Sequence, residues 1–219
     1  MTTAISELDE FLDSIPVGDR RARFHDLAEA MLKAERPVWI LETGCMRALG
    51  NPEGDGCSTL VWDYIAARTK GKCITIDIAS QNVEFTKTQV SSYTDVICCE
   101  SVRFLTSITQ LAQPIDFLYL DSMDWAGDLL SRGLSSLHHA AELCAAWPWV
   151  AYGGLIAVDD CVGEYAGKHA LVHRFFDMIG AEPMVDDYIH VWRKPMPAKA
   201  LELFSCPESK IRAPEIQGD

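Results

Sequence analysis

The stretch WILETGCMRALGNPEGDGCST, residues 39–59, decides the fold. It begins with a short apolar run, continues through Gly44 into a long turn, and ends where helical spacing starts at Ser58. A strand, a glycine-bearing turn and a helix in this order are typical of the first unit of an open parallel sheet, which holds a ligand at such a turn. The turn is longer than a dinucleotide needs, because Gly54 and Gly56 follow ten and twelve residues after Gly44.

Short β-rich runs and longer segments with helical spacing alternate along the rest of the chain. The apolar runs predict strands at Val38–Thr43, Cys73–Ile78, Asp95–Cys99, Ile115–Leu120 and Gly154–Asp159. The segments between them predict helices that begin near Ser58, Gln81, Ser101 and Leu134. A further helix that ends at Gly180 is followed by a hairpin around Asp186 and Asp187. The sequence therefore predicts an α/β fold with a Rossmann-like, doubly wound, mostly parallel sheet and a C-terminal antiparallel hairpin.

Two terminal segments lie outside this alternation. We expect residues 1–36 to form an N-terminal helical extension, residues 37–195 the ligand-binding domain, and residues 196–219 a proline-bearing C-terminal tail. We also expect an apolar stripe of the extension to pack on the core or on a second copy of the chain, which would make a homo-oligomer. This stripe consists of Phe24, Leu27, Ala28, Met31 and Leu32.

Composition and charge argue against several classes of function. A formal net charge of −13, with no basic run, makes nucleic acid an unfavourable partner. No apolar stretch approaches the roughly 20 residues of a membrane span, and the N-terminus has no signal-peptide pattern, so we expect a soluble, cytoplasmic chain without membrane contact. The eight cysteines contain no C-x-x-C pair. We interpret them as reduced thiols rather than as disulfides or zinc ligands.

Acidic residues follow the predicted strands, at the edge where open parallel sheets bind ligands. Asp77 lies 21 residues after Gly56, near the roughly 20-residue spacing at which a carboxylate accepts ribose hydroxyls. Glu42 would repel a phosphate, and the motif G-x-G-x-x-G is absent. A positively charged adenosine-type ligand is therefore favoured over a dinucleotide. The five successive strand ends carry Glu42, Asp77, Glu100, Asp121 and the pair Asp159-Asp160.

Four motifs carry a resemblance to a known family: LETGC at 41–45, ITIDI at 74–78, IDFLYLDS at 115–122 and GGLIAVDDC at 153–161. In this order and spacing they resemble the motifs of class I S-adenosylmethionine-dependent methyltransferases. More narrowly, the chain is similar to small bacterial metal-dependent O-methyltransferases that act on sugars and other natural products. The resemblance covers roughly residues 37–195. It implies S-adenosylmethionine as the cofactor and a hydroxylated small molecule as the methyl acceptor.

The resemblance also implies roles for individual positions. Met46 stands where the family has a second glycine, and residues 46–55 contain an insertion that we interpret as a flap over the methionine end of the cofactor. The hydroxyls of Ser58 and Thr59 are expected to face the same crevice from the start of the next helix. The resemblance places Glu42, Thr43 and Gly44 in the cofactor loop, Asp77 with Ile78 at the ribose, Glu100 with Ser101 beside the adenine, and Asp121 against the cofactor.

A magnesium site is one open question at these strand ends. Asp121, Asp159 and Asp160 resemble the three positions with which metal-dependent O-methyltransferases bind Mg²⁺, an ion that prefers hard oxygen ligands. Such an ion would orient the acceptor and lower the pKa of its hydroxyl. The alternative is that Asp121 only contacts the cofactor and the Asp159-Asp160 pair caps the next segment.

A general base is a second open question, because an alcohol is a poor nucleophile until its proton leaves. Asp124 lies three residues after Asp121 on the same predicted loop. His138 and His139 are predicted near the start of a helix at this face. Neighbouring helical residues point about 100° apart, so at most one of the two histidines can face the site.

Two other patterns are interpreted as structural. His169 and His173 are four residues apart but lack the glutamate of H-E-x-x-H, so we interpret them as a pair on one helix face. Lys168 is interpreted as a solvated side chain, with a substrate carboxylate as the alternative partner.

Three functions stay open on the sequence alone. The leading hypothesis is an S-adenosylmethionine-dependent O-methyltransferase. An NAD-dependent oxidoreductase would share the doubly wound sheet, but its phosphate-binding motif is missing. A cofactor-binding partner subunit without catalysis is the third hypothesis. The acceptor itself cannot be read from the sequence, because loops determine specificity in such folds.

Overall fold

The computed structural model describes residues 2–49, 57–163 and 166–196. Gly54, Gly56, most of the interpreted flap and the tail from residue 197 onward lie outside the described residues. Within them, one sheet has the strand order β3-β2-β1-β4-β5-β7-β6. Its strands are β1 (Trp39–Thr43), β2 (Lys72–Asp77), β3 (Thr94–Cys98), β4 (Ile115–Leu120), β5 (Val150–Val158), β6 (Val185–Asp186) and β7 (His190–Arg193).

The pairing of these strands confirms the predicted fold class. Strands β1 to β5 pair in parallel, β7 is antiparallel to β5, and β6 is antiparallel to β7. The chain starts in the middle of the sheet, adds β2 and β3 on one side, and then crosses to add β4 and β5 on the other side. This reversal between β1 and β4 creates a crevice at the carboxyl ends of the strands.

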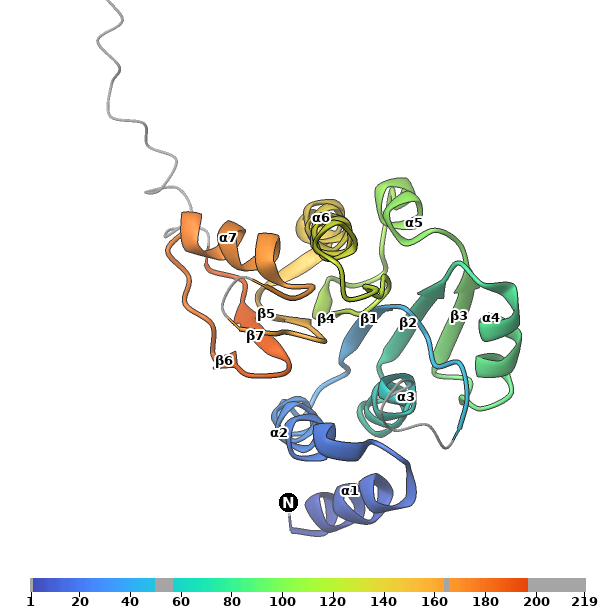
Figure 1. Cartoon of the computed structure of the whole chain (residues 1–219). Helices are drawn as coiled ribbons and strands as arrows, with labels where there is room; N and C mark the ends of the chain where they lie inside the picture. Colours follow the sequence, from blue (N-terminus) through green and yellow to red (C-terminus); the bar gives the residue numbers. More distant parts are fainter. Residues whose placement is uncertain (1, 50–56, 164–165, 197–219) are drawn as a thin grey trace, which may run out of the picture.

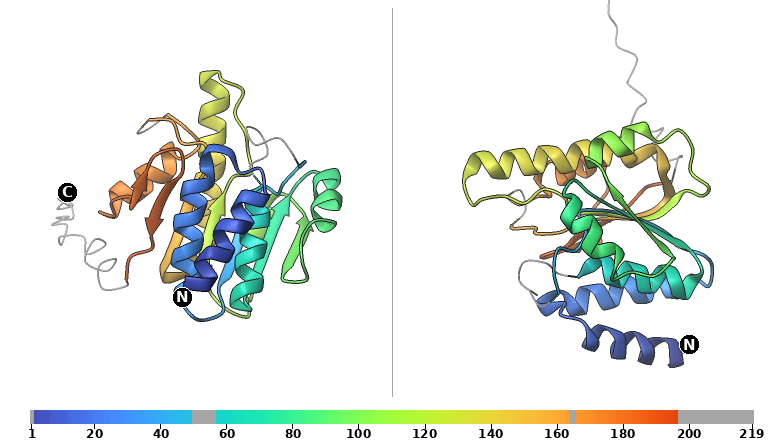
Figure 2. Two further views of the ribbon diagram at one scale, coloured as in Figure 1. Left: turned by 90° about the horizontal axis from the view of Figure 1, so that it is seen from below. Right: turned by 90° about the vertical axis from the view of Figure 1, so that its right-hand side faces the viewer.

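Helices cover both faces of the sheet (Figure 1). Helices α2 and α3 lie on one face and α5, α6 and α7 on the other, while α4 packs beside β2 and β3. Figure 2 shows α1 as an outer layer beyond α2 and α3. The helices are α1 (Thr2–Ser14), α2 (Arg21–Leu32), α3 (Ser58–Thr69), α4 (Ser80–Lys87), α5 (Ser101–Ser107), α6 (Leu129–Ala146) and α7 (Ala170–Met178), with 3-10 turns η1 (Gly18–Arg20) and η2 (Trp147–Trp149).

Two boundaries differ from the predicted ones by more than three residues. Helix α6 begins at Leu129 rather than near Leu134, because the Asp128 side chain accepts a hydrogen bond from the N–H of Ser131 at 2.9 Å and caps the helix there. Strand β5 begins at Val150 rather than at Gly154. Leu129 and Leu130 are exposed, and Gly153 and Gly154 interrupt the apolar run of β5, so neither start shows as a buried periodic pattern in the sequence.

Alternating residues of each strand face the two helical layers, as a pleated sheet requires. On β4, Phe117 and Tyr119 belong to the apolar core beneath α2 and α3, whereas Leu118 and Leu120 belong to the core beneath α6 and α7. All four side chains are fully buried. Burial on both faces explains why the parallel strands appear in the sequence as continuous apolar runs.

The N-terminal extension packs on the core of its own chain. Phe24 of α2 is fully buried, and its ring lies 5.4 Å from that of Trp62 on α3 at a steep angle of 83°. Phe11 of α1 stacks on Tyr64 of α3 at 4.2 Å. The described cysteines are all free thiols. None of the described helices is both long and apolar enough to span a membrane.

Candidate functional site

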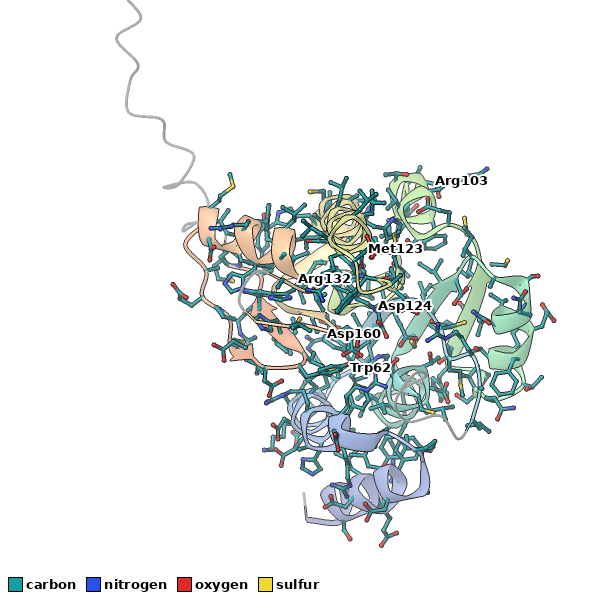
Figure 3. All side chains as sticks on the ribbon, in the orientation of Figure 1. Trp62, Arg103, Met123, Asp124, Arg132 and Asp160 are labelled. Carbon is teal, nitrogen blue, oxygen red and sulfur yellow. The ribbon has the colours of Figure 1, made fainter. Side chains whose placement is uncertain are left out.

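A cleft of about 520 Å³ opens at the carboxyl ends of the parallel strands. It has the size of a small-molecule site and lies at the reversal point between β1 and β4. Figure 3 labels Asp124 and Asp160, which lie near each other at the centre of the view. Four carboxylates from three loops line this cleft, those of Asp77, Asp121, Asp124 and Asp160.

A smaller hollow of about 190 Å³ continues the cleft past Gly44, Asp77 and Ile78, which line both cavities. Ile78 is 73% exposed although it is apolar, so its side chain offers a hydrophobic surface to anything bound there. The two cavities form one trough. Further residues of the smaller hollow include Glu100, Ser101 and His138.

Gly44 lets two loops of the cleft approach each other. It has a φ of +82°, and a Cβ at this position would lie 2.4 Å from the backbone oxygen of Asp121. Only glycine accepts both constraints without a shift of the backbone. The close contact between the two loops therefore requires a glycine at position 44, whether or not the loop also binds a ligand.

Glu42 lies beneath the cleft and does not line it. Its carboxylate is fully buried and accepts hydrogen bonds of 2.7 Å from each of the hydroxyls of Ser58, Thr59 and Thr75. Burial raises the pKa of Glu42 to about 7, although the three hydroxyls oppose the rise. Here the structure differs from the expectation, since Glu42 anchors the start of α3 rather than facing a ligand. Of Ser58 and Thr59, only Ser58 lines the cleft.

Asp77 holds the loops after β1 and β2 together and also lines both cavities. Its carboxylate accepts hydrogen bonds from the N–H of Ala79 at 2.7 Å, the N–H of Cys45 at 3.2 Å and the amide of Asn82 at 3.2 Å. These donors fix the carboxylate at the rim of the trough, where a ligand hydroxyl can still reach it.

A second buried carboxylate, Glu142 of α6, lies behind the smaller hollow. It accepts hydrogen bonds from Ser122 at 2.6 Å and from Thr43 at 3.1 Å, so Thr43 supports the cleft from within the core. His138 has its Nε2 3.3 Å from Glu142 and 3.0 Å from the hydroxyl of Ser101. Hydrogen bonding to Glu142 raises the pKa of His138. Among the described residues, His138 lines the smaller hollow and not the larger cleft.

His139 and Glu100 have structural roles in this arrangement. His139 is fully buried, its Nδ1 donates to the carbonyl of Ser135 at 2.7 Å, and burial lowers its pKa to about 4. Its side chain points into the core, so it differs from the expectation of a base at the cleft. Glu100 caps α5 by accepting from the N–H groups of Val102 and Arg103 at 3.1 and 2.7 Å.

Lys168 connects the acidic loops of the cleft. Its Nζ lies 2.6 Å from Asp121, 3.0 Å from Asp124 and 2.7 Å from Asp160, and its side chain is fully buried. The interpretation of Lys168 as a solvated side chain is therefore corrected. Gly167, the residue before Lys168, allows this segment to pack closely against the loop of Asp160, because a Cβ at Gly167 would lie 2.7 Å from the backbone oxygen of Asp160.

The charges of this Lys168 cluster, which we define as Lys168, Asp121, Asp124 and Asp160, are strongly coupled. Burial alone would lower the pKa of Lys168, yet the three carboxylates raise it well above its ordinary value, so the ammonium stays charged. Burial raises the pKa of Asp121 well above its usual range, with Lys168 opposing the rise. Burial would also raise the pKa of Asp124, but Lys168 and the Arg47 guanidinium at 2.8 Å lower it.

Asp159 is not part of this cluster. It is fully buried, and its carboxylate accepts from Arg20 at 2.8 Å, from the Tyr119 hydroxyl at 2.6 Å and from the N–H of Asp160 at 2.8 Å. These three donors occupy both of its oxygens. The expected set of Asp121, Asp159 and Asp160 is therefore not brought together, because Asp159 points toward the N-terminal segment that carries Arg20.

The carboxylates at these strand ends pair with the Lys168 ammonium, which takes the place that a divalent metal ion would need. Asp121, Asp124 and Asp160 each offer an oxygen, and these oxygens lie within 4.8 Å of one another. The Nζ of Lys168 lies among them, at hydrogen-bonding distance from all three. A magnesium ion at this place would have to displace a buried cation that already balances the carboxylates.

Sequence reasoning missed two residues of the site. Tyr188, whose hydroxyl donates to Asp160, comes from a segment with no recognised motif. Arg20 is 139 positions from Asp159 in the chain. Lys168 could be noticed as a lysine that follows a glycine, but this pattern does not reveal its burial among three carboxylates.

Comparisons with solved structures agree with this fold. The MycE methyltransferase from the mycinamycin biosynthetic pathway, in complex with Mg, SAH and mycinamycin VI, is 20% identical with a TM-score of 0.59. The match covers 87% of this chain and 54% of MycE, so this chain spans about half the length of MycE. The O-methyltransferase NovP is 13% identical with a TM-score of 0.56, and 80% of each chain is covered.

A third solved structure has a similar fold. NSun6 from Pyrococcus horikoshii, solved with SFG, is 15% identical with a TM-score of 0.56, over 77% of this chain and 51% of its own. No protein-family model matches the sequence, and no curated protein matches it. Likeness at this level of identity establishes the fold, and the chain has the Rossmann-like fold of the class I S-adenosylmethionine-dependent methyltransferases.

Proposed function

We propose that the chain is an S-adenosylmethionine-dependent methyltransferase that methylates a hydroxyl group of a small molecule. The observation that carries the proposal is the trough at the switch point, which combines a ribose-type carboxylate, Asp77, with an acidic cleft. The shared fold with MycE and NovP supports it, since the former was solved with SAH and the latter is an O-methyltransferase.

The residues of the trough fit this cofactor. The Asp77 carboxylate would accept the ribose hydroxyls, and the exposed Ile78 would cover one face of the adenine in the smaller hollow. The cleft carries more carboxylates than cations, which suits the sulfonium and disfavours the pyrophosphate of NAD. Ser58, Glu100 and Ser101 complete the proposed contacts, whereas Glu42, Thr43 and Thr59 act on the cofactor loop from below.

When bound, the cofactor would supply an electrophilic methyl group for the acceptor oxygen, with the thioether as the leaving group. The acceptor must also lose its hydroxyl proton. Asp121 is the proposed base, because its raised pKa makes it a stronger base than Asp124. The Lys168 ammonium would stabilise the negative charge that develops on the acceptor oxygen.

Methyl transfer without magnesium is part of the proposal. MycE was solved with Mg, and a metal would orient the acceptor in such an enzyme. In this chain the buried Lys168 ammonium already holds Asp121, Asp124 and Asp160. We therefore expect methyl transfer to persist in EDTA, and activity that is lost in EDTA and restored by Mg²⁺ would contradict the role given to Lys168.

A second cavity is the proposed entrance for the acceptor. It has a volume of about 640 Å³ and shares Arg20 and Tyr188 with the cofactor cleft. Its lining includes Asp19, Arg23 and Asp187, all of which can hydrogen bond to hydroxyl groups. We propose a polar, hydroxylated acceptor of the natural-product or sugar type for this cavity, and no nucleic acid or membrane as partner.

Calorimetric titration tests the cofactor. The wild-type chain should bind S-adenosylmethionine and not NAD, which separates the proposal from an oxidoreductase. Asp77→Ala should weaken binding at least tenfold, because it removes the acceptors for the ribose hydroxyls. Asp95→Ala removes a carboxylate that pairs with Lys72 at the surface, at 2.7 Å, and should bind like wild type. NAD binding without S-adenosylmethionine binding would refute the proposal.

Turnover tests the reaction. Release of S-adenosylhomocysteine should depend on a hydroxylated acceptor and should be lost in Asp121→Asn, while cofactor affinity stays near that of wild type. Because Asp121 must be ionised to accept a proton, the rate should rise with pH through its elevated pKa. Cofactor binding without turnover on any hydroxylated acceptor would favour a non-catalytic partner subunit.

A further inference from the structure

Three ligands of the type that zinc prefers meet outside the cofactor trough. Cys161 follows β5, His169 precedes α7 and His190 opens β7. The Cys161 sulfur and one ring nitrogen of each histidine lie within 4.8 Å of one another. All three side chains are buried, and the rings of His169 and His190 are 4.1 Å apart between centroids.

We propose that Cys161, His169 and His190 bind a Zn²⁺ ion. One thiolate and two imidazoles form a donor set that suits zinc rather than magnesium or calcium. In a tetrahedral zinc site the ligand atoms lie about 3.3–3.6 Å apart, as follows from Zn–S and Zn–N bonds of about 2.3 and 2.0–2.1 Å. Ligand atoms within 4.8 Å of one another reach this geometry when each pair closes by at most about 1.5 Å.

The hydrogen bonding of these side chains supports the site independently. The Nδ1 of His190 is buried and has no hydrogen-bond partner within the described part of the chain. A buried polar atom without a partner is costly, and a bond to a metal would satisfy it. The thiol of Cys161 makes a weak hydrogen bond of 3.2 Å to the carbonyl of Val158, which the sulfur can give up when it loses its proton to solvent and binds the ion.

His173 is placed to complete the coordination. It lies one turn after His169 on α7, and its ring centroid is 5.6 Å from that of His190. Its Nε2 lies 3.4 Å from Asp177, an arrangement that orients the ring. The fourth ligand is therefore His173 or a water molecule, and the two cases differ in whether the His173→Gln variant keeps its affinity.

The place of the three ligands indicates what the ion would do. Cys161 directly follows Asp160, His169 directly follows Lys168, and His190 is two residues after Tyr188. None of the three ligands lines the described cofactor cleft. An ion here would hold together the three segments that carry the wall of the cleft, so its role is structural and does not depend on the proposed methyl transfer.

Cobalt titration of the full-length chain tests this site. Protein stripped with EDTA and kept reduced with a phosphine should bind one equivalent of Co²⁺ with tetrahedral d–d bands and a thiolate-to-cobalt charge-transfer band. Zn²⁺ should displace the cobalt and raise Tm. His190→Gln should weaken binding at least tenfold. Cys161→Ser should lose the charge-transfer band, whereas the matched Cys144→Ser, which changes an exposed free cysteine of α6, should keep it.

The charge-transfer band also separates this site from the carboxylates of the Lys168 cluster, because an ion held only by oxygen ligands gives no such band. Circular dichroism shows whether each variant is folded, and His190→Gln decides the question if Cys161→Ser is not. The proposal is overturned if wild-type protein shows no charge-transfer band, or if folded Cys161→Ser keeps the band of wild type.

Discussion

Replacing Lys168 with methionine tests the electrostatic centre of the cleft. Methionine keeps an unbranched apolar stem of similar length, so Lys168→Met removes mainly the charge. The ammonium is fully buried and lies 2.6–3.0 Å from three carboxylates. Without it, Asp121, Asp124 and Asp160 repel one another across a partly desolvated space.

The expected cost follows from this burial. Removing one partner of a buried, hydrogen-bonded ion pair costs roughly 3–5 kcal/mol, because the remaining charge is left uncompensated. Asp124 keeps its 2.8 Å contact with Arg47, which offsets part of the repulsion. We therefore expect a loss near the lower end, about 3 kcal/mol at pH 8. The loss should shrink at lower pH, because Asp121, whose pKa burial already raises, can then take up a proton.

Urea unfolding followed by circular dichroism measures this loss. Lys72→Met is the matched control, since Lys72 pairs with Asp95 at 2.7 Å at the surface, and it should cost no more than about 1 kcal/mol. Because three oxygens within 4.8 Å then lose the cation that they share, Mg²⁺ or Ca²⁺ should stabilise Lys168→Met and not wild type. A loss below that of Lys72→Met, or no effect of divalent ions on the variant, would refute the reasoning.

Three further changes test other parts of the fold. Burial raises the pKa of Glu42 from 4.5 to about 7, so its contribution to stability is complete below pH 4.5 and is lost as the pH rises through 7. Glu42→Gln should therefore gain roughly 3 kcal/mol relative to wild type between pH 4.5 and 8 in urea unfolding, and a difference that does not change with pH would contradict this. Gly44→Ala should lower stability by about 1–3 kcal/mol and weaken cofactor binding, because φ is +82° and the new Cβ meets the backbone of Asp121. The control Gly133→Ala, on α6 with open space around it, should neither lower stability nor weaken binding. Equal effects of the two substitutions would argue against the close approach of the loops at Gly44. Removing residues 1–34 should expose Trp62 and cause aggregation, and light scattering that shows a monodisperse truncated chain with unchanged Tm would show that the extension is dispensable.

The positions of the strands and the class of the sheet could be predicted because they depend on local patterns. The parallel strands are buried on both faces, so each appears as an apolar run such as residues 115–120. Asp77 could be placed at the trough because a parallel strand delivers its last residue to the same edge as its neighbours. These inferences need only the spacing of apolar residues along the sequence and the rule that ligands bind at the carboxyl ends of parallel strands.

The partners of the acidic residues were decided by the tertiary structure alone. Glu42 and Asp159 stand at strand ends, as Asp77 does. Hydroxyls of α3 and β2 cover Glu42, and Arg20 of the N-terminal extension covers Asp159. Lys168 reaches Asp121 across 47 positions of the chain. The sequence by itself determined which residues stand at the strand ends, whereas packing of distant segments determined which of them face the cleft, since burial and pairing depend on contacts that have no local period.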